Sequence, residues 1–274
     1  MSAPSSAPSG LTSLLHYRAR AALLLLVFSV ILRVLVSSVT GAEAAVQAKA
    51  PSKSAAKARP VWSFTPDPAL PNVLILGDSI SVGYTLGVRA RLAGRANVFR
   101  PLLADASGPE NCEGTTLGAK RIEAWLAGRK WDVIHFNWGL HDLKHVKLAA
   151  TSQNSDDASD PVQAAIPAYV ENLRLIISRL QATGARLVFA TTTPVVPETR
   201  NPFRSPDSPP AYNAAAFALM KANGVRVNDL FALTAPKLGE IQHPRNVHFN
   251  AAGSEMLAAE VARVLGEELD RPQR

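Results

Sequence analysis

The fold is decided by the stretch Asn72-Val73-Leu74-Ile75-Leu76-Gly77-Asp78-Ser79-Ile80. Its first five residues form a short apolar run, which is typical of a buried strand. Gly-Asp-Ser then predicts a sharp turn into a helix, which leaves a serine hydroxyl at the carboxyl edge of a sheet. Ligands of open α/β folds usually bind at that edge. Ser79 is therefore a candidate nucleophile that needs a base and oxyanion donors from elsewhere in the chain.

Strand-like and helix-like segments alternate from residue 71 onward. Such alternation predicts a parallel sheet that is covered by helices on both faces. The expected strands lie at about 72–76, 96–99, 131–136, 186–191 and 225–227, and the expected helices at about 81–92, 117–127, 161–182, 211–223 and 251–269. No internal repeat or break in composition divides residues 71–270, which indicates a single domain.

Residues 1–44 are predicted to be a signal peptide. Arg18 and Arg20 precede an apolar run at 21–32, and an Ala-x-Ala site follows at residues 42–44. The domain is therefore expected to be secreted or periplasmic.

The alternative is an uncleaved N-terminal anchor that tethers the domain to a membrane, outside the cytoplasm. A transmembrane helix needs about 20 apolar residues, and Arg33 interrupts the apolar segment here. Residues 45–70 are rich in Ala, Lys, Ser and Pro and are predicted to be a flexible linker.

The formal net charge of +7 comes mostly from the N-terminal part of the chain. Residues 1–70 contain seven Lys and Arg but only two Asp and Glu, so the remainder carries a charge of only +2. No basic cluster stands out in that remainder, and we expect no nucleic-acid partner. The single cysteine, Cys112, excludes an intrachain disulfide and is expected to be a small buried residue.

His248 is the candidate base for Ser79. It lies in Asn246-Val247-His248-Phe249-Asn250, just before the last expected helix. A loop at that position in a parallel α/β fold can place the imidazole beside Ser79. The imidazole would take the serine proton and later protonate the leaving group.

These residues make the chain resemble the SGNH/GDSL hydrolase superfamily. Gly77-Asp78-Ser79 is followed by Ile80-Ser81, and a Val-His pair stands before the final helix. The resemblance covers about residues 71–268 and implies a flavodoxin-like three-layer α/β/α sandwich with a parallel sheet of about five strands. It also implies four sequence blocks around the active site and no required metal or cofactor.

The second and third blocks supply the oxyanion hole in that superfamily, and both are altered here. A Gly-x-Thr-Thr pattern would place glycine at 113, whereas this chain has Glu113 followed by Gly114. A backbone N–H of one of these two residues is the expected donor. In the third block, usually Gly-x-Asn-Asp, the chain has Gly139-Leu140-His141-Asp142. His141 stands at the donor position, and Asn137 is the rival donor. The matching residues of the blocks are expected to support the site: Asp78, Gly139 and Asp142.

The fourth block differs from the superfamily pattern more than the second and third blocks do. The acid that precedes the histidine by three positions in the superfamily is replaced by Arg245, which cannot accept a hydrogen bond from imidazole. Three alternatives remain open. In the first, Asn246 orients the ring through its side-chain carbonyl. In the second, a carboxylate of Asp229 or Glu240 orients it. In the third, a backbone carbonyl holds His248, and the catalytic unit is a Ser-His dyad.

Other polar residues after position 130 have simpler interpretations. His135, His141, Asp142 and His145 are possible metal ligands by residue type. A metal site is nevertheless not expected, because His135 lies on a strand and His141 in a loop, and their side chains need not converge. Lys144 and Lys147 are expected to be solvated.

The expected function is that of an exported serine esterase or acyl hydrolase that works through an acyl-serine intermediate. Its substrate would be a small-molecule or polysaccharide ester, with a carbohydrate acetyl ester as one option that the superfamily suggests. The alternative is a non-catalytic carbohydrate- or envelope-binding protein that kept the fold with a degenerate site.

Overall fold

The computed structural model describes residues 61–272. The predicted signal peptide and residues 45–60 of the predicted linker lie outside the described residues. In the part of the chain that is described, no helix is both long and apolar enough to cross a membrane.

Five parallel strands form one sheet in the order β2-β1-β3-β4-β5, which is the flavodoxin-like order. The adjacent central strands are in register through Leu76, Phe136 and Phe189. The predicted fold class, a parallel α/β sandwich, is confirmed. The strands are β1 (Asn72–Leu76), β2 (Asn97–Phe99), β3 (Val133–Phe136), β4 (Arg186–Ala190) and β5 (Arg226–Asn228).

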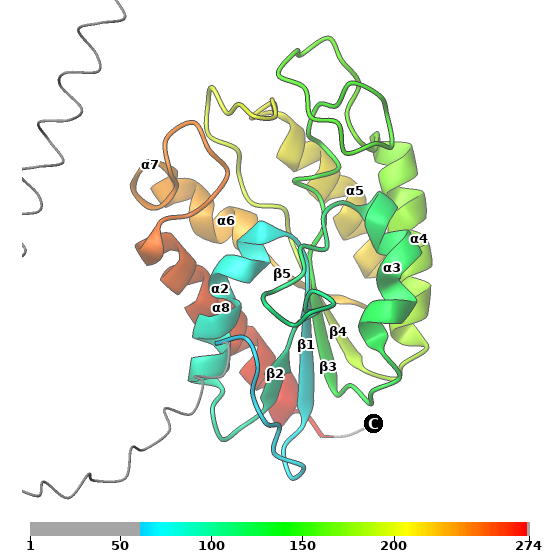
Figure 1. The fold of residues 1–274 in the computed structure, drawn as a ribbon, viewed down its shortest axis with the longest axis vertical. Helices are drawn as coiled ribbons and strands as arrows, with labels where there is room; N and C mark the ends of the chain where they lie inside the picture. The colour runs from blue at the N-terminus through cyan, green and yellow to red at the C-terminus, as the bar shows by residue number, and fades with distance from the viewer. Residues whose placement is uncertain (1–60, 273–274) are drawn as a thin grey trace, which may run out of the picture. The chain divides into compact units, whose positions relative to one another are not determined.

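Helices cover both faces of the sheet, with α2 and α8 on one face and α3, α4 and α5 on the other (Figure 1). The strands β1 and β3 are buried along their whole apolar runs, which is what coverage on both faces requires. The long helices are α2 (Ser79–Arg91), α3 (Thr115–Leu126), α4 (Ile166–Gln181), α5 (Ser208–Ala222) and α8 (Ala251–Asp270). Between β5 and α8 lie α6 (Leu230–Thr234), the 3₁₀ turn η1 (Ala235–Lys237) and α7 (Leu238–Ile241).

Four helix starts differ from the sequence prediction, and two of them have identifiable reasons. Helix α2 begins at Ser79 because the Asp78 carboxylate accepts from the Ile80 N–H and caps the first turn. Helix α4 begins at Ile166, later than predicted, because the backbone before it is already paired. The Gln163 and Ala164 N–H groups donate to carbonyls of the loop after β3, at 2.9 Å each.

The domain also begins before the predicted boundary at residue 71. The Phe64 ring lies 4.9 Å from the Phe99 ring, and the Arg89 guanidinium lies 4.4 Å above the Phe64 ring. The Asp67 N–H donates to Asn97 at 2.8 Å. Phe64 and Asp67, which lie in the segment predicted to be a linker, therefore contact β2 and α2.

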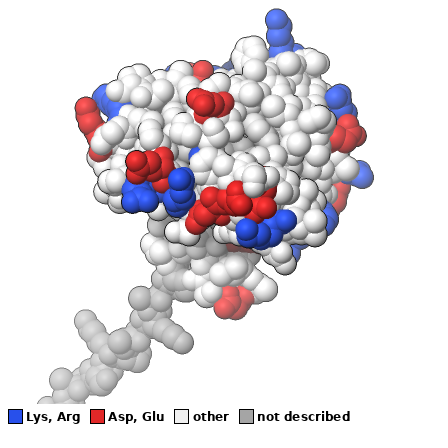
Figure 2. All heavy atoms as spheres, turned by 90° about the horizontal axis from the view of Figure 1, so that it is seen from above, with Lys and Arg blue, Asp and Glu red and all other residues white. Residues whose placement is uncertain are grey.

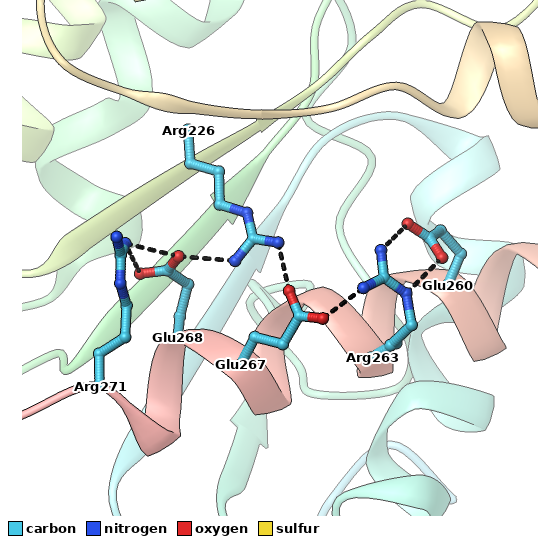
Figure 3. A network of polar contacts seen from close by, with 6 residues as sticks. All are labelled: Arg226, Glu260, Arg263, Glu267, Glu268 and Arg271. Carbon is cyan, nitrogen blue, oxygen red and sulfur yellow. Dashed lines mark hydrogen bonds and ion pairs between the residues drawn. The ribbon is translucent and has the colours of Figure 1, made fainter.

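A network of ion pairs ties β5 to the end of α8 (Figure 3). Glu268 is only 2% exposed, and its carboxylate binds Arg226 at 2.8 Å and Arg271 at 2.9 Å. Burial opposes ionisation of Glu268, but the hydrogen bonds from the two arginines outweigh it and lower its pKa. The network continues on the helix surface through Glu267, Arg263 and Glu260.

Candidate active site

The candidate site lies where β1 and β3 end side by side. Because β2 lies on one side of β1 and β3 on the other, the loops after β1 and β3 diverge and leave a crevice between them. A pocket of about 260 Å³ opens there. It is lined by residues from the β1–α2 turn, the loop after β3 and the loop before α8, among them Ser79, His141 and His248.

Ser79 is the first residue of α2 and meets His248 directly, with Ser79 Oγ 2.8 Å from His248 Nε2. The turn before it requires glycine. Gly77 has φ +148°, and a Cβ there would lie 3.0 Å from Ser81 Oγ and 3.1 Å from the Asn137 carbonyl oxygen. The structure thus brings together the predicted nucleophile and the predicted base, which are 169 residues apart in the chain.

Asn246 holds the other side of the His248 ring. Its Oδ1 lies 2.6 Å from His248 Nδ1 and also accepts the backbone N–H of His248 at 3.0 Å. Because a backbone N–H can only donate, the Asn246 atom beside it must be the carbonyl oxygen. Nδ1 must then carry the ring hydrogen, and Nε2 keeps the lone pair that accepts the Ser79 O–H.

The carboxylates considered for this role lie elsewhere. Asp229 caps α6, and its Oδ1 accepts from the Ala232 N–H and the Thr191 hydroxyl at 3.0 Å each. Among the described residues, neither Asp229 nor Glu240 forms a hydrogen bond with the His248 ring. Arg245, at the position of the superfamily's acid, is exposed and lies 3.7 Å from Glu198. Of the alternatives that the sequence left open, the geometry favours Asn246.

The environment of His248 favours the neutral imidazole. Partial burial lowers the pKa of His248, and electrostatic interactions with Arg204 and His243 lower it further. A neutral ring is the form that acts as a general base.

Two backbone N–H groups and His141 are the candidate oxyanion donors. Ser79 N–H and Gly114 N–H have no acceptor in the part of the chain that the structure describes. The Glu113 N–H, by contrast, donates to Asn111 Oδ1 at 2.9 Å, and Glu113 has φ +47°, a conformation that favours glycine. Gly114 is therefore the better placed of the two candidates from the second block.

His141 lines the pocket beside the Gly114 loop. Burial lowers its pKa to about 3, and nearby positive charges add to this, so the ring is neutral. A neutral imidazole carries one N–H, and no described residue accepts it. A Cβ placed on Gly114 would lie 3.2 Å from His141 Cβ, which shows that the second and third blocks are in contact.

Asn137, the rival oxyanion donor, is not placed for that role. Its side-chain Nδ2 donates to the carbonyls of Ala190 at 2.8 Å and Thr191 at 3.2 Å. Both hydrogens of the amide nitrogen are thus used within the fold. Asn137 instead joins the end of β3 to the end of β4.

Asp142 and Gly139 hold the third block in place. Asp142 Oδ1 accepts from both the backbone N–H and the hydroxyl of Thr115, which fixes the start of α3. Burial raises the pKa of Asp142 to about 7, although the hydrogen bonds from Thr115 oppose this. Gly139 has φ +154°, and a Cβ there would lie 1.8 Å from Thr192 Oγ1, so only glycine fits.

Three basic residues near the site were missed or misplaced by the sequence analysis. Arg100 is buried under the β1–α2 turn and donates to the Gly77 carbonyl at 2.9 Å and the Glu110 carbonyl at 3.0 Å. Lys144, predicted to be solvated, is only 4% exposed, and Arg204 is 6% exposed. Both line the pocket. No spacing in the sequence distinguishes them from surface residues.

The remaining histidines play other parts. His135 is fully buried in β3 against Tyr84, and burial lowers its pKa to about 3. His145 Nδ1 lies 2.7 Å from the Asp160 carbonyl oxygen. Among the described residues, no group of three or more His, Cys, Asp and Glu is arranged to hold a metal ion.

Residues 75–256 match the GDSL-like Lipase/Acylhydrolase family. Among solved structures, the fold is similar to a lipase/acylhydrolase from Enterococcus faecalis, with a TM-score of 0.57 and 20% identity over 74% of this chain and 100% of that one. An acetyl xylan esterase has a TM-score of 0.55 and 15% identity over 71% of this chain and 99% of its own. A variant of an acetyl-xylooligosaccharide esterase from Geobacillus has a TM-score of 0.56 and 15% identity, over 74% and 97%. No curated protein matches the sequence.

Proposed function

The chain belongs to the GDSL-like Lipase/Acylhydrolase family and is a hydrolase of ester bonds, and we propose that it is a serine esterase with Ser79 as nucleophile and His248 as general base. The observation that carries this proposal is the 2.8 Å separation between Ser79 Oγ and His248 Nε2. Asn246 serves as a neutral orienter of the base, in place of the usual acid.

The reaction follows from this arrangement. Ser79 Oγ attacks the ester carbonyl while His248 Nε2 takes the hydroxyl proton. The N–H groups of Ser79 and Gly114, together with His141, hold the negative charge on the carbonyl oxygen. The intermediate then expels the alcohol, which receives the proton from His248, and the acyl group stays on Ser79. A water molecule, deprotonated by His248, attacks the acyl-serine; the bond to Ser79 Oγ breaks, His248 returns the proton to Oγ, and the acid is released.

The substrate that we propose is a small acyl ester, and an acetyl ester of a carbohydrate fits best. The pocket of about 260 Å³ is smaller than the about 300–1,000 Å³ of pockets that enclose drug-sized ligands. Two of the structures with this fold are esterases of acetylated xylan or xylooligosaccharides. A small pocket leaves room for a short acyl group and an alcohol that extends into solvent.

We also propose that the enzyme acts outside the cytoplasm. This proposal depends on the basic segment, the apolar run at 21–32 and the small-residue site at 42–44. N-terminal sequencing of the protein recovered from the periplasm or the medium tests it. A mature N-terminus close to residue 45 is expected, whereas an intact N-terminus in the membrane fraction would instead indicate the anchor.

The catalytic proposal is tested with p-nitrophenyl acetate and a fluorophosphonate probe. Ser79→Ala should lose at least about 10³-fold in kcat/KM and all labelling, because the nucleophile is gone. Ser178→Ala, an exposed serine on α4, is the matched control and should behave as the wild type. A wild-type protein that neither hydrolyses the ester nor accepts the probe at Ser79 would contradict the proposal and favour a binding protein with a degenerate site.

A further inference from the structure

The pocket beside Ser79 has an unusual charge distribution. Three basic residues line it, Lys144, Arg200 and Arg204, whereas Asp78 is the only acidic residue in its lining. Asp78 itself is buried under the turn, and burial raises its pKa. The pocket therefore carries an excess of positive charge next to the nucleophile.

Lys144 is the most informative of the three. Its side chain is almost wholly withdrawn from solvent, at 4% exposure, yet no described residue accepts a hydrogen bond from its Nζ or forms an ion pair with it. The nearest acids form no ion pair with it: Asp142 accepts from Thr115 through Oδ1, and Glu113 accepts from the Ser152 hydroxyl at 3.3 Å. An ammonium group at the wall of the pocket, without a protein acceptor, is available to bind an anion there.

Arg204 is placed similarly. Its Nε donates to the Leu140 carbonyl at 2.7 Å, and Nη1 lies 3.5 Å from the Pro202 carbonyl. Both acceptors are uncharged, and the residue is only 6% exposed. The backbone thus fixes one edge of the guanidinium, and Nη2 has no partner in the described part of the chain. A guanidinium held in this way offers a donor of fixed direction to an oxyanion.

Several basic residues on the surface are paired with acids instead. On the face drawn in Figure 2, several Lys and Arg side chains adjoin Asp or Glu side chains. Lys147, three residues after Lys144, is exposed and lies 2.8 Å from Asp160. Cations are thus paired with acids at many places on the surface, whereas those that line the pocket are not.

We propose that the ester substrate carries an anionic group, a carboxylate or a phosphate, that Lys144, Arg200 and Arg204 bind while Ser79 attacks the acyl carbon. This inference rests on the proposed function. It narrows the substrate class to esters whose alcohol part bears a carboxylate or phosphate group, such as an acetylated acidic sugar. Arg200 is exposed at the pocket rim and anchored by its own backbone neighbour, the Thr199 carbonyl, at 3.0 Å. It would meet the anion first, and the two buried cations would hold it.

The test compares three acetyl esters that differ in one substituent: 4-acetoxybenzoate, 4-acetoxyphenyl phosphate and the neutral 4-acetoxybenzamide. The carboxamide is the most electron-withdrawing of the three substituents, so intrinsic reactivity favours the neutral ester. The wild type should nevertheless have at least about 10-fold higher kcat/KM on one of the anionic esters, and added salt should reduce this preference. The benzoate and phosphate arms distinguish the two kinds of anion.

Variants assign the preference to residues. Lys144→Met should lower the ratio of anionic to neutral kcat/KM about 10-fold, because it removes a charged donor and keeps the side-chain volume. Arg200→Gln changes an exposed residue and serves as a second test if Lys144→Met folds poorly. It should lower the ratio of anionic to neutral kcat/KM several-fold. Lys147→Met is the matched control and should leave the ratio unchanged.

Three outcomes would overturn the inference. Equal kcat/KM on neutral and anionic esters, with activity that depends on Ser79, would overturn it and leave the serine esterase standing. An anionic preference that both Lys144→Met and Arg200→Gln retain would also overturn it. Absence of hydrolysis of all three esters and of p-nitrophenyl acetate would overturn it together with the proposed function.

Discussion

Asn246 accepts two hydrogen bonds from His248 through one carbonyl oxygen, from the ring Nδ1 at 2.6 Å and from the backbone N–H at 3.0 Å. The pair fixes the ring orientation and its tautomer without any carboxylate. An acid at this position would also stabilise the imidazolium that forms when the base takes the serine proton. A neutral amide orients the ring but supplies much less of that stabilisation.

Asn246→Asp should therefore raise kcat on p-nitrophenyl acetate by about 10-fold or more, because it introduces a charge that stabilises the imidazolium. Steady-state kinetics at neutral pH measure this. Asn154→Asp is the control, since Asn154 also lines the pocket but does not contact His248. Equal effects of the two substitutions would mean that charge in the pocket, and not the contact with the ring, causes the change.

The pH dependence of kcat/KM should show an acidic limb below pH 6.5. Partial burial, and electrostatic interactions with Arg204 and His243, lower the pKa of His248 from its ordinary value of 6.5, so the ring stays neutral to lower pH. Arg204→Met removes a cation, which favours the imidazolium, and should move the limb to higher pH. A pH–rate profile with an uncharged ester measures both. A limb that moves to lower pH in Arg204→Met would contradict this assignment.

Gly139→Ala should destabilise the domain by about 3 kcal/mol or more, because the new methyl group would lie 1.8 Å from Thr192 Oγ1 and the backbone at φ +154° is unfavourable to alanine. Chemical denaturation measures it. Gly94→Ala isolates the backbone contribution, since Gly94 has φ +74° with open space around it, and should cost only about 1–2 kcal/mol. Similar losses in the two variants would rule out the steric explanation.

Glu268→Gln should lower the free energy of unfolding at neutral pH by about 1–3 kcal/mol, since it removes the charge that pairs with Arg226 and Arg271. The pKa of Glu268 is lower in the folded protein than its ordinary value of 4.5. Its contribution is therefore present above pH 4.5 and disappears as the pH falls through the folded pKa. Denaturation at several pH values should show the difference from wild type shrinking in acid. Glu171→Gln, which breaks an exposed pair on α4, should have little effect at any pH.

The sequence predicted the fold well because the relevant signals are local. The apolar run at 72–76 and the glycine that ends it define β1 and the turn, and the family blocks locate Ser79 and His248. The sequence did not predict α6 and α7, which follow β5. Each is too short to show the repeated spacing of apolar residues by which a helix is recognised in a sequence.

The finer assignments at the site depend on side-chain directions that a sequence does not contain. Asn137 and His141 were equal candidates as oxyanion donors, and only the structure shows that the Asn137 amide binds the carbonyls after β4. Lys144 and Lys147 look alike in the sequence, but the loop after β3 turns one inward and the other outward. These differences arise from tertiary packing.

Arg100 links the nucleophile turn to the loop that follows β2, through the carbonyls of Gly77 and Glu110. That loop is closed at its base by a bridge between Leu102 and Pro109, while residues 103–107 at its tip are exposed. The guanidinium and the bridge hold the base of this loop, so the tip is not needed to position the nucleophile turn. We therefore expect the tip to accept an inserted peptide, an affinity tag or a surface-immobilisation handle with turnover retained.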